Sequence, residues 1–353
     1  MYLVNIIIIL GYFFAAFTFL FNIIISFAQT KRSYHLKHKE SFYSLCISLG
    51  VLISSCLLIF LFNTFNFLMS VIIVLCAGIL FLLFIIFNII QYLLEHRKEV
   101  TAKEGINLSG RENFHHELIR KIFHIILFFG IIALLVSAYE ILMYLNAQYD
   151  FHIILDRYWG SLDGLNMCRL RSFDFGQGII FMLFLLLTTI FTINEGARIG
   201  KWFYFPLRKL ASFGIREKEK ETVASYVYFA VGMLFAAIFL YPVPLFSVIG
   251  ILCFADTAAS LFGRRYGKHK LQFNRTKSWE GSAAGFIVCL IVTFLLVGFI
   301  WGLVASLVFF IIDSITPVLP ISDNIGIPLA ATSAYLLLSL LQIPMYSFLF
   351  SFL

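Results

Sequence analysis

Charged residues are scarce in this chain of 353 residues: they make up 13% of it, whereas ordinary soluble domains carry roughly 25%. Cysteine is scarce as well, because the six cysteines lie far apart, without a CxxC pair or a Cys/His metal spacing. We therefore expect neither a disulfide framework nor a zinc site. A P-loop is missing too. The segment 263–270 reads GxxxGK, one residue short of GxxxxGK, with His269 in place of Ser or Thr and no strand expected before it.

Hydrophobic residues make up 61% of the chain. Runs of about 20 apolar residues recur along most of the length, and each can cross a hydrocarbon core about 30 Å thick. They predict an all-α, polytopic transmembrane helical bundle of about ten spans, in preference to a soluble helical domain. The expected spans are 3–28, 41–62, 67–94, 122–145, 177–194, 223–241, 244–262, 281–299, 300–318 and 327–352. The first run lacks a basic n-region and is too long for a cleaved signal, so we expect a retained span.

Lysine and arginine alternate between the loops. The segments 30–40, 95–121, 195–222 and 263–280 hold 23 of the 26 basic residues. Ten spans place these four segments on one side, which the positive-inside rule makes cytoplasmic. The net charge of +7 is then mainly a topology signal, with anionic lipid headgroups as a secondary partner. Nucleic-acid binding is not expected, because the charge is divided among membrane loops.

A mixed-charge polar stretch divides the chain. Residues 95–117 separate a leading three-span region, 1–94, from the remainder, 118–353. The leading spans carry no ionisable residue in their apolar interiors, whereas the second part carries several. We expect residues 118–353 to hold the catalytic machinery and 95–117 to be a cytoplasmic linker. No role for 1–94 follows from the sequence.

Three acidic residues lie inside expected spans: Glu140, Asp256 and Asp313. Such residues are costly in a membrane and indicate functional sites. Asp256 lies seven residues before Gly263, about 10 Å along a helix, and so comes close to the basic loop. The competing interpretation is a buried carboxylate that pairs with a neighbouring helix.

Basic segments gather on the same side as Asp256. The turn that runs from Gly263 to Lys270 combines glycines, which permit positive φ and close backbone approach, with donors suited to phosphate. In "TKSWEGS", Ser278 is expected to cap the next helix, with Glu280 in its first turn and Lys277 just outside. Such a helix N-terminus binds anions, although simple capping needs only the serine.

Two further motifs lie on that side. In "RKIFH", Arg120 and His124 are spaced i, i+4 and share a helix face, beside Lys121. In "NEGAR", Glu195 and Arg198 are spaced i, i+3 and can pair. A carboxylate and several cations near one membrane face are the composition of a phosphate and Mg²⁺ site.

The run "FADTAASLFGRRYGKHK…RTKSWEGSAAGF" closely resembles the signature of the CTP-dependent polyprenol kinases, which include dolichol, phytol and CTP-dependent diacylglycerol kinases. It is more distantly similar to that of phosphatidate cytidylyltransferases. "RKIFH", "NEGAR", "REKEKETVASYVYFAVG" with "YPVP", and "SDNIGIP" match in the same order, over roughly 118–353. A departure is Ala255, where glycine is expected in many relatives.

The resemblance implies a lipid-alcohol kinase that transfers the γ-phosphate of CTP, with Mg²⁺ or a similar divalent cation. The implied catalytic residues are Asp256, Lys277, Arg120 and Lys121. The implied metal ligands are Asp256, which serves either the metal or the acceptor hydroxyl, and Asp323. The implied CTP-binding residues are His124, Glu195, Arg198, Gly263, Arg264, Arg265, Gly267, Lys268, Ser278, Glu280 and Asn324.

Several alternatives stay open. A cytidylyltransferase would use the same CTP and metal but attack the α-phosphate, and a transporter would use the intramembrane acids as ion sites. The expected acceptor is dolichol or a similar polyprenol, although phytol and diacylglycerol also present one primary hydroxyl on an apolar tail. The expected location is the endoplasmic reticulum membrane in a eukaryote or the cell membrane in a prokaryote, with a cytoplasmic active site. The sequence leaves the oligomeric state open.

Overall fold

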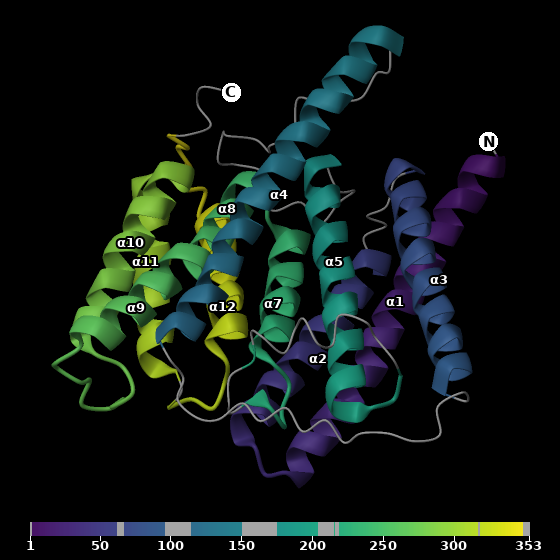
Figure 1. The fold of residues 1–353 in the computed structure, drawn as a ribbon. Coiled ribbons are helices and arrows are strands. Elements are labelled where there is room, and N and C mark those ends of the chain that lie inside the picture. Colours follow the sequence, from purple (N-terminus) through teal and green to yellow (C-terminus); the bar gives the residue numbers. More distant parts are fainter. Residues whose placement is uncertain are drawn as a thin grey trace.

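The computed structural model describes residues 2–61, 67–95, 114–149, 175–203, 215, 219–316 and 318–348, and within them the chain is all-α with no strand (Figure 1). The α-helices are α1 (Tyr2–His35), α2 (Lys39–Leu61), α3 (Phe67–Glu95), α4 (Phe114–Tyr149), α5 (Phe175–Glu195), α7 (Ser225–Phe239), α8 (Pro242–Gly250), α9 (Asp256–Tyr266), α10 (Trp279–Val297), α11 (Phe299–Ile315) and α12 (Asp323–Leu340). Two π-helical turns interrupt them: η1 (Gly196–Gly200) follows α5, and η3 (Ile251–Ala255) joins α8 to α9.

Each expected apolar segment contains a helix, which confirms the predicted all-α bundle. Seven helices in the described residues are long and apolar enough to cross a membrane: α1, α2, α3, α4, α5 with η1, the continuous helix from α8 to α9, and α10. The apolar helices α7 and α11 are shorter. The last expected span, 327–352, is shorter than predicted, since α12 ends at Leu340.

Helices α7 and α8 lie at the centre of the described bundle, because most residues of α7 and all residues of α8 are buried. Helices α2, α5 and α12 all pack against α7, while α9, α10 and α11 form a second group beside them. The leading region is tied to the rest, because α1 packs on α5 and α2 packs on α7. Most of the predicted linker 95–117 lies outside the described residues, and α4 already begins at Phe114.

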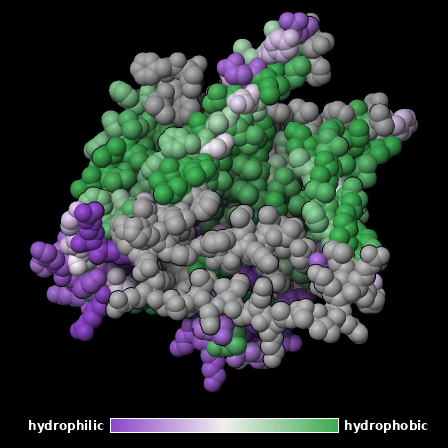
Figure 2. All heavy atoms as spheres, in the orientation of Figure 1, coloured by the Kyte–Doolittle hydropathy of each residue, from purple (hydrophilic) through white to green (hydrophobic). Residues whose placement is uncertain are grey.

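Polar and apolar surfaces are separated along the bundle. Figure 1 shows that α1, α5 and α9 end, and that α2, α10 and α12 begin, at one end of the bundle, while α1 begins at the other. In Figure 2 hydrophilic atoms gather at that end, below a band of hydrophobic ones. The described parts of the basic segments 30–40 and 263–280 therefore share one end, as predicted. Parts of the other two basic segments lie outside the described residues.

Candidate active site

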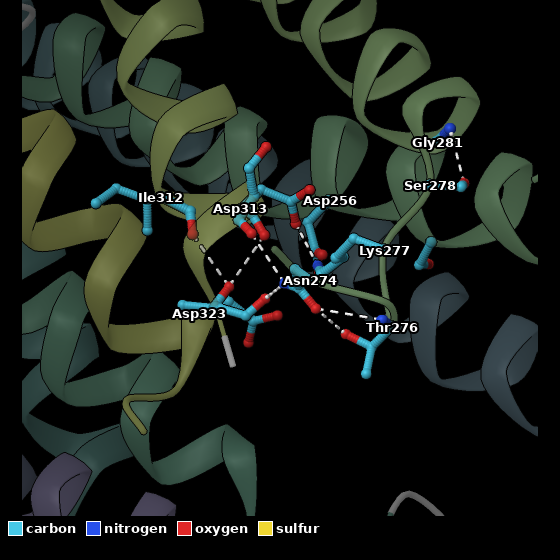
Figure 3. A network of polar contacts seen from close by, with 12 residues as sticks. Asp256, Asn274, Thr276, Lys277, Ser278, Gly281, Ile312, Asp313 and Asp323 are labelled. Atoms are coloured by element: carbon cyan, nitrogen blue, oxygen red, sulfur yellow. Dashed lines mark hydrogen bonds and ion pairs between the residues drawn. The ribbon is translucent and has the colours of Figure 1, made fainter. Parts of the chain in front are cut away.

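A cavity of about 480 Å³ opens at the polar end of the bundle, between α9, α10, the loop 267–278 and the facing ends of α11 and α12. Figure 3 shows Asp256, Asp313, Asp323 and Lys277 close together there. Its lining residues are Glu40, Asp256, Ala259, Ser260, Gly263, Arg264, Gly267, Lys270, Thr276, Lys277, Ser278, Gly281, Ser282, Asp313, Thr316, Ile321 and Asp323. The volume falls within the roughly 300–1,000 Å³ typical of small-molecule sites.

Asp256 is the first residue of α9 and directly follows the π-helical turn η3. Such turns are rare and often mark functional positions, because they shift the helix register at one point. Asp256 is 7% exposed, and its carboxylate Oδ2 accepts a hydrogen bond from the ammonium of Lys121 on α4, which is also buried. The structure thus joins two motifs that lie 135 residues apart. The side chain of Arg120, predicted beside Lys121, lies outside the described residues.

A second ion pair lines the cavity. The Nζ of Lys277 lies 2.5 Å from Oδ1 of Asp313, which is buried near the end of α11. Burial alone would lower the pKa of Lys277, but the carboxylates of Asp313, Asp323 and Asp256 raise it above its ordinary value. Lys277 is therefore a cation at neutral pH. The second carboxylate oxygen of Asp313 is buried and has no hydrogen-bond partner among the residues that the structure describes.

The loop before α10 is fixed to α11. The side-chain amide of Asn274 donates to the carbonyls of Ser314 at 2.8 Å and Thr316 at 2.7 Å. Its oxygen accepts from the hydroxyl of Thr276 at 2.6 Å. These bonds hold Lys277 at the mouth of the cavity. The sequence analysis did not single out Asn274 or Thr276, because their contacts with α11 and with each other have no sequence motif.

Ser278 caps α10 as predicted, since its hydroxyl accepts from the backbone N–H of Gly281 at 3.3 Å. Glu280 does not reach the cavity. Its Oε1 lies 2.7 Å from Nδ1 of the exposed His269, and it also accepts from the His269 backbone N–H. This contact closes the loop 267–278 on the outside.

Gly263 and Gly267 of the predicted turn lie where α9 comes close to the start of α10. Neither Gly263 nor Gly267 adopts a positive φ, because α9 continues through Gly263 to Tyr266. Both contact α10 instead: a Cβ on Gly267 would lie 2.4 Å from the Ser278 hydroxyl, and one on Gly281 would lie 2.8 Å from the Gly263 Cα. Small residues at a helix interface let two backbones approach closely. Gly263 still lines the cavity, so its predicted phosphate contact stays a prediction.

Glu195 and Arg198 form an ion pair, the Glu195–Arg198 clasp, and neither residue lines the cavity. Arg198 donates to both carboxylate oxygens of Glu195, at 2.9 and 2.6 Å. His124 likewise lies outside the cavity, where its backbone carbonyl accepts from the thiol of Cys253 and its ring contacts Phe229. The predicted CTP contacts of these three residues stay predictions.

Of the remaining residues that were predicted to bind CTP or metal, some line the cavity and others do not. Arg264 and Asp323 line the cavity, whereas Arg265 and Lys268 do not. The guanidinium of Arg265 lies 5.4 Å from the centre of the Tyr266 ring. Asn324, at the start of α12, donates through its backbone and side-chain N–H groups to Oδ1 of Asp323, at 2.9 and 3.2 Å. These bonds orient the Asp323 carboxylate.

The donor set fits a divalent cation held together with phosphate. No group of three or more His, Cys, Asp or Glu able to hold a metal occurs in the described residues. However, Mg²⁺ is usually held by one or two carboxylates, with substrate phosphates and water completing its octahedron. Asp256 and Asp323 line one cavity with Asp313, whose unpartnered oxygen is a ready ligand. Of these, Asp313 was noted as an intramembrane acid but was not predicted as a ligand.

The chain is similar to several lipid-alcohol kinases. It is 26% identical over 138 residues to phytol kinase 1, chloroplastic, of Arabidopsis thaliana, covering 34% of this chain and 45% of that one. It is 28% identical over 181 residues to the farnesol kinase of the same plant (46% and 59%). It is 39% identical over 75 residues to CTP-dependent diacylglycerol kinase 1 of Eremothecium gossypii (21% and 23%).

The matched regions span about half or less of the length of most of these relatives. No family model and no solved structure matches the chain. The relatives nevertheless agree in kind, since each is named as a kinase of phytol, farnesol or diacylglycerol. The predicted resemblance is therefore confirmed: this chain is a homologue, at modest identity, of the lipid-alcohol kinases.

Proposed function

We propose that this protein is an integral membrane kinase that transfers the γ-phosphate of CTP to an isoprenoid alcohol. The observation that carries the proposal is the cavity at the polar end of the bundle, where Lys277 and three aspartates meet beside the Lys121–Asp256 pair. The kinase relatives support the reaction, and the name of one of them supports the donor.

The cations of the cavity suit a triphosphate. Lys277, Arg264 and Lys270 line it, and α10 begins beside it with its capped N-terminus. Phosphoryl transfer asks a protein mainly to position the reactants and to neutralise charge on the phosphate oxygens. Lys277 can perform both tasks, because it remains protonated and is held in place through Asp313.

One or two of the carboxylates of Asp256, Asp313 and Asp323 would hold a divalent cation together with the phosphates of the nucleotide. When bound there, the ion would offset the negative charge of the triphosphate. Asp256 has a second role open to it, since its carboxylate can accept the proton of the attacking hydroxyl. The ammonium of Lys121 fixes its orientation.

The acceptor would reach the cavity from the bilayer. Helix α9 carries both Phe262, which is 49% exposed, and the buried Asp256. Phe262 can therefore contact the apolar tail of the alcohol outside the cavity while Asp256 contacts its hydroxyl inside. Phytol and farnesol, named in the relatives, are isoprenoid alcohols of this kind. A polyprenol such as dolichol presents the same kind of hydroxyl and is therefore a candidate acceptor as well. The basic end, and with it the site, would face the cytoplasm of an endoplasmic reticulum or cell membrane.

The test is a transfer assay with the purified protein in vesicles. γ-Labelled CTP and Mg²⁺ are supplied with dolichol, phytol, farnesol or diacylglycerol in turn. We expect the label to enter an isoprenoid alcohol. Absence of labelled lipid with all four acceptors would contradict the proposal, and labelled diacylglycerol alone would contradict its acceptor class.

A further inference from the structure

A second cavity, of about 410 Å³, adjoins the first at the polar end. The two share Glu40, and Ser322 of the second is the chain neighbour of Asp323 in the first. The residues that line the second cavity are Lys37, His38, Lys39, Glu40, Ser41, Glu219, Thr222, Val223, Ser225, Tyr228 and Ser322. Part of its wall thus comes from the turn between α1 and α2, in the region to which the sequence assigned no role.

Hydrogen bonds fix three walls of this cavity to one another. The hydroxyls of Ser33 on α1 and Ser41 on α2 lie 3.1 Å apart, and that of Ser41 lies 3.2 Å from the phenol oxygen of Tyr228 on α7. The backbone N–H of Ser322 donates to the hydroxyl of Ser44 at 2.8 Å, which ties α12 to α2. The cavity therefore has a defined shape.

The Glu195–Arg198 clasp fixes the fourth wall. Arg198 donates to the backbone carbonyls of Lys220 at 2.8 Å and Thr222 at 2.6 Å. Glu195 accepts from the backbone N–H of Ala224 at 3.1 Å. The clasp thereby holds the segment 219–224, which carries three residues of the cavity lining. The "NEGAR" motif thus positions one wall of the second cavity without lining either cavity.

We propose that the second cavity binds the cytidine part of the donor nucleotide, while the first binds its phosphates and the reacting hydroxyl. The inference rests on the proposed function, because it takes CTP as the donor. It assigns a role to the α1–α2 turn, which completes the nucleotide site.

The chemistry of the lining matches a cytidine. Glu219 is 6% exposed and lines only the second cavity, and a carboxylate there accepts a hydrogen bond from the exocyclic amine of cytosine. Uracil presents an oxygen at that position, which a carboxylate repels. Thr222 and Ser225 supply hydroxyls for the ribose. Lys37 and Lys39 place positive charge beside Glu40, where the nucleotide would pass from one cavity to the other.

The experiment compares donors in two matched variants of the full-length protein. Glu219→Gln alters the proposed cytosine contact, whereas Glu221→Gln makes the same change at an exposed residue outside both cavities. The measured quantity is kcat/KM for CTP and for UTP with one alcohol. For Glu219→Gln we expect the preference for CTP over UTP to fall about tenfold, through a loss with CTP. For Glu221→Gln we expect the wild-type preference.

An unchanged CTP/UTP preference in a folded, active Glu219→Gln protein would overturn the inference. If this variant melts at a lower temperature than wild type, Ser225→Leu replaces it as the test. That change fills the second cavity and should raise KM for CTP about tenfold, and an unchanged KM would equally overturn the inference.

Two further outcomes are distinguishable. If Lys39→Gln changes the response of activity to anionic lipid in the vesicles but leaves KM for CTP unchanged, the cavity serves a lipid headgroup and the inference is wrong. If the wild-type protein transfers no γ-phosphate, the proposed function itself fails, before any variant is compared.

Discussion

The buried pair between Lys121 and Asp256 allows structural and catalytic roles to be separated. Asp256→Asn keeps the shape of the side chain but leaves the Lys121 ammonium, only 3% exposed, without its counter-charge. Breaking a buried pair by removing one partner costs about 3–5 kcal/mol of stability. The asparagine amide oxygen still accepts a hydrogen bond, so we expect a loss of about 3 kcal/mol. If Asp256 also serves the reacting groups, turnover should fall at least about 100-fold.

The double variant Lys121→Met/Asp256→Asn distinguishes the two effects. Replacing both charges removes the uncompensated ammonium, and such replacements are often close to neutral for stability. We expect thermal melting in detergent to recover most of the loss, while transfer from γ-labelled CTP stays as low as in the single variant. Glu140→Gln on α4 is the control, because this intramembrane acid is exposed and lies outside the cavity. A double variant that regains activity, or a fully active Asp256→Asn protein, would refute the reasoning.

Three further changes test other parts of the account. Lys277→Ala removes the charged phosphate contact that we propose and should raise KM for CTP about 10- to 100-fold in steady-state kinetics, and a wild-type KM would exclude the contact. Gly281→Val places a Cβ 2.7 Å from a backbone oxygen of α9 and should lower the melting temperature. Gly50→Val is the control and should not lower it, because a Cβ on Gly50 would have no atom of the described residues within 4 Å. Cysteines introduced at Lys37 and Lys270 should react with an impermeant reagent from the same side of sealed vesicles, and labelling from opposite sides would overturn the topology.

The sequence predicts the helices well because apolar runs of membrane length have few alternatives to a helix. Their ends are less predictable. Helix α9 continues to Tyr266, past the expected end of its span at residue 262, because its final turn carries Arg264 and Arg265. Basic side chains in the last turn complement the helix dipole, so a polar sequence there extends the helix instead of ending it.

The site is only partly predictable for a different reason. Motif spacing reports contacts within a helix, whereas Lys121 and Asp256 meet across 135 residues, and Lys277 and Asp313 across 36. Nothing in the local sequence indicates which carboxylate pairs with which lysine. The glycines show the same limit, since Gly263 reads equally well as a phosphate contact or as a helix-packing position. The contribution of the α1–α2 turn has no motif, because it depends on how two distant segments pack.

The most direct test of the central claim uses CTP labelled separately in its α- and γ-phosphates, supplied to the purified protein with an isoprenoid alcohol and Mg²⁺. A kinase forms a lipid monophosphate that carries the γ-label and no cytidine, and we predict this product from wild type and its loss in Asp256→Asn. A lipid that carries the α-label together with cytidine would show a cytidylyltransferase and contradict the account. Equal transfer from γ-labelled ATP would contradict the proposed donor.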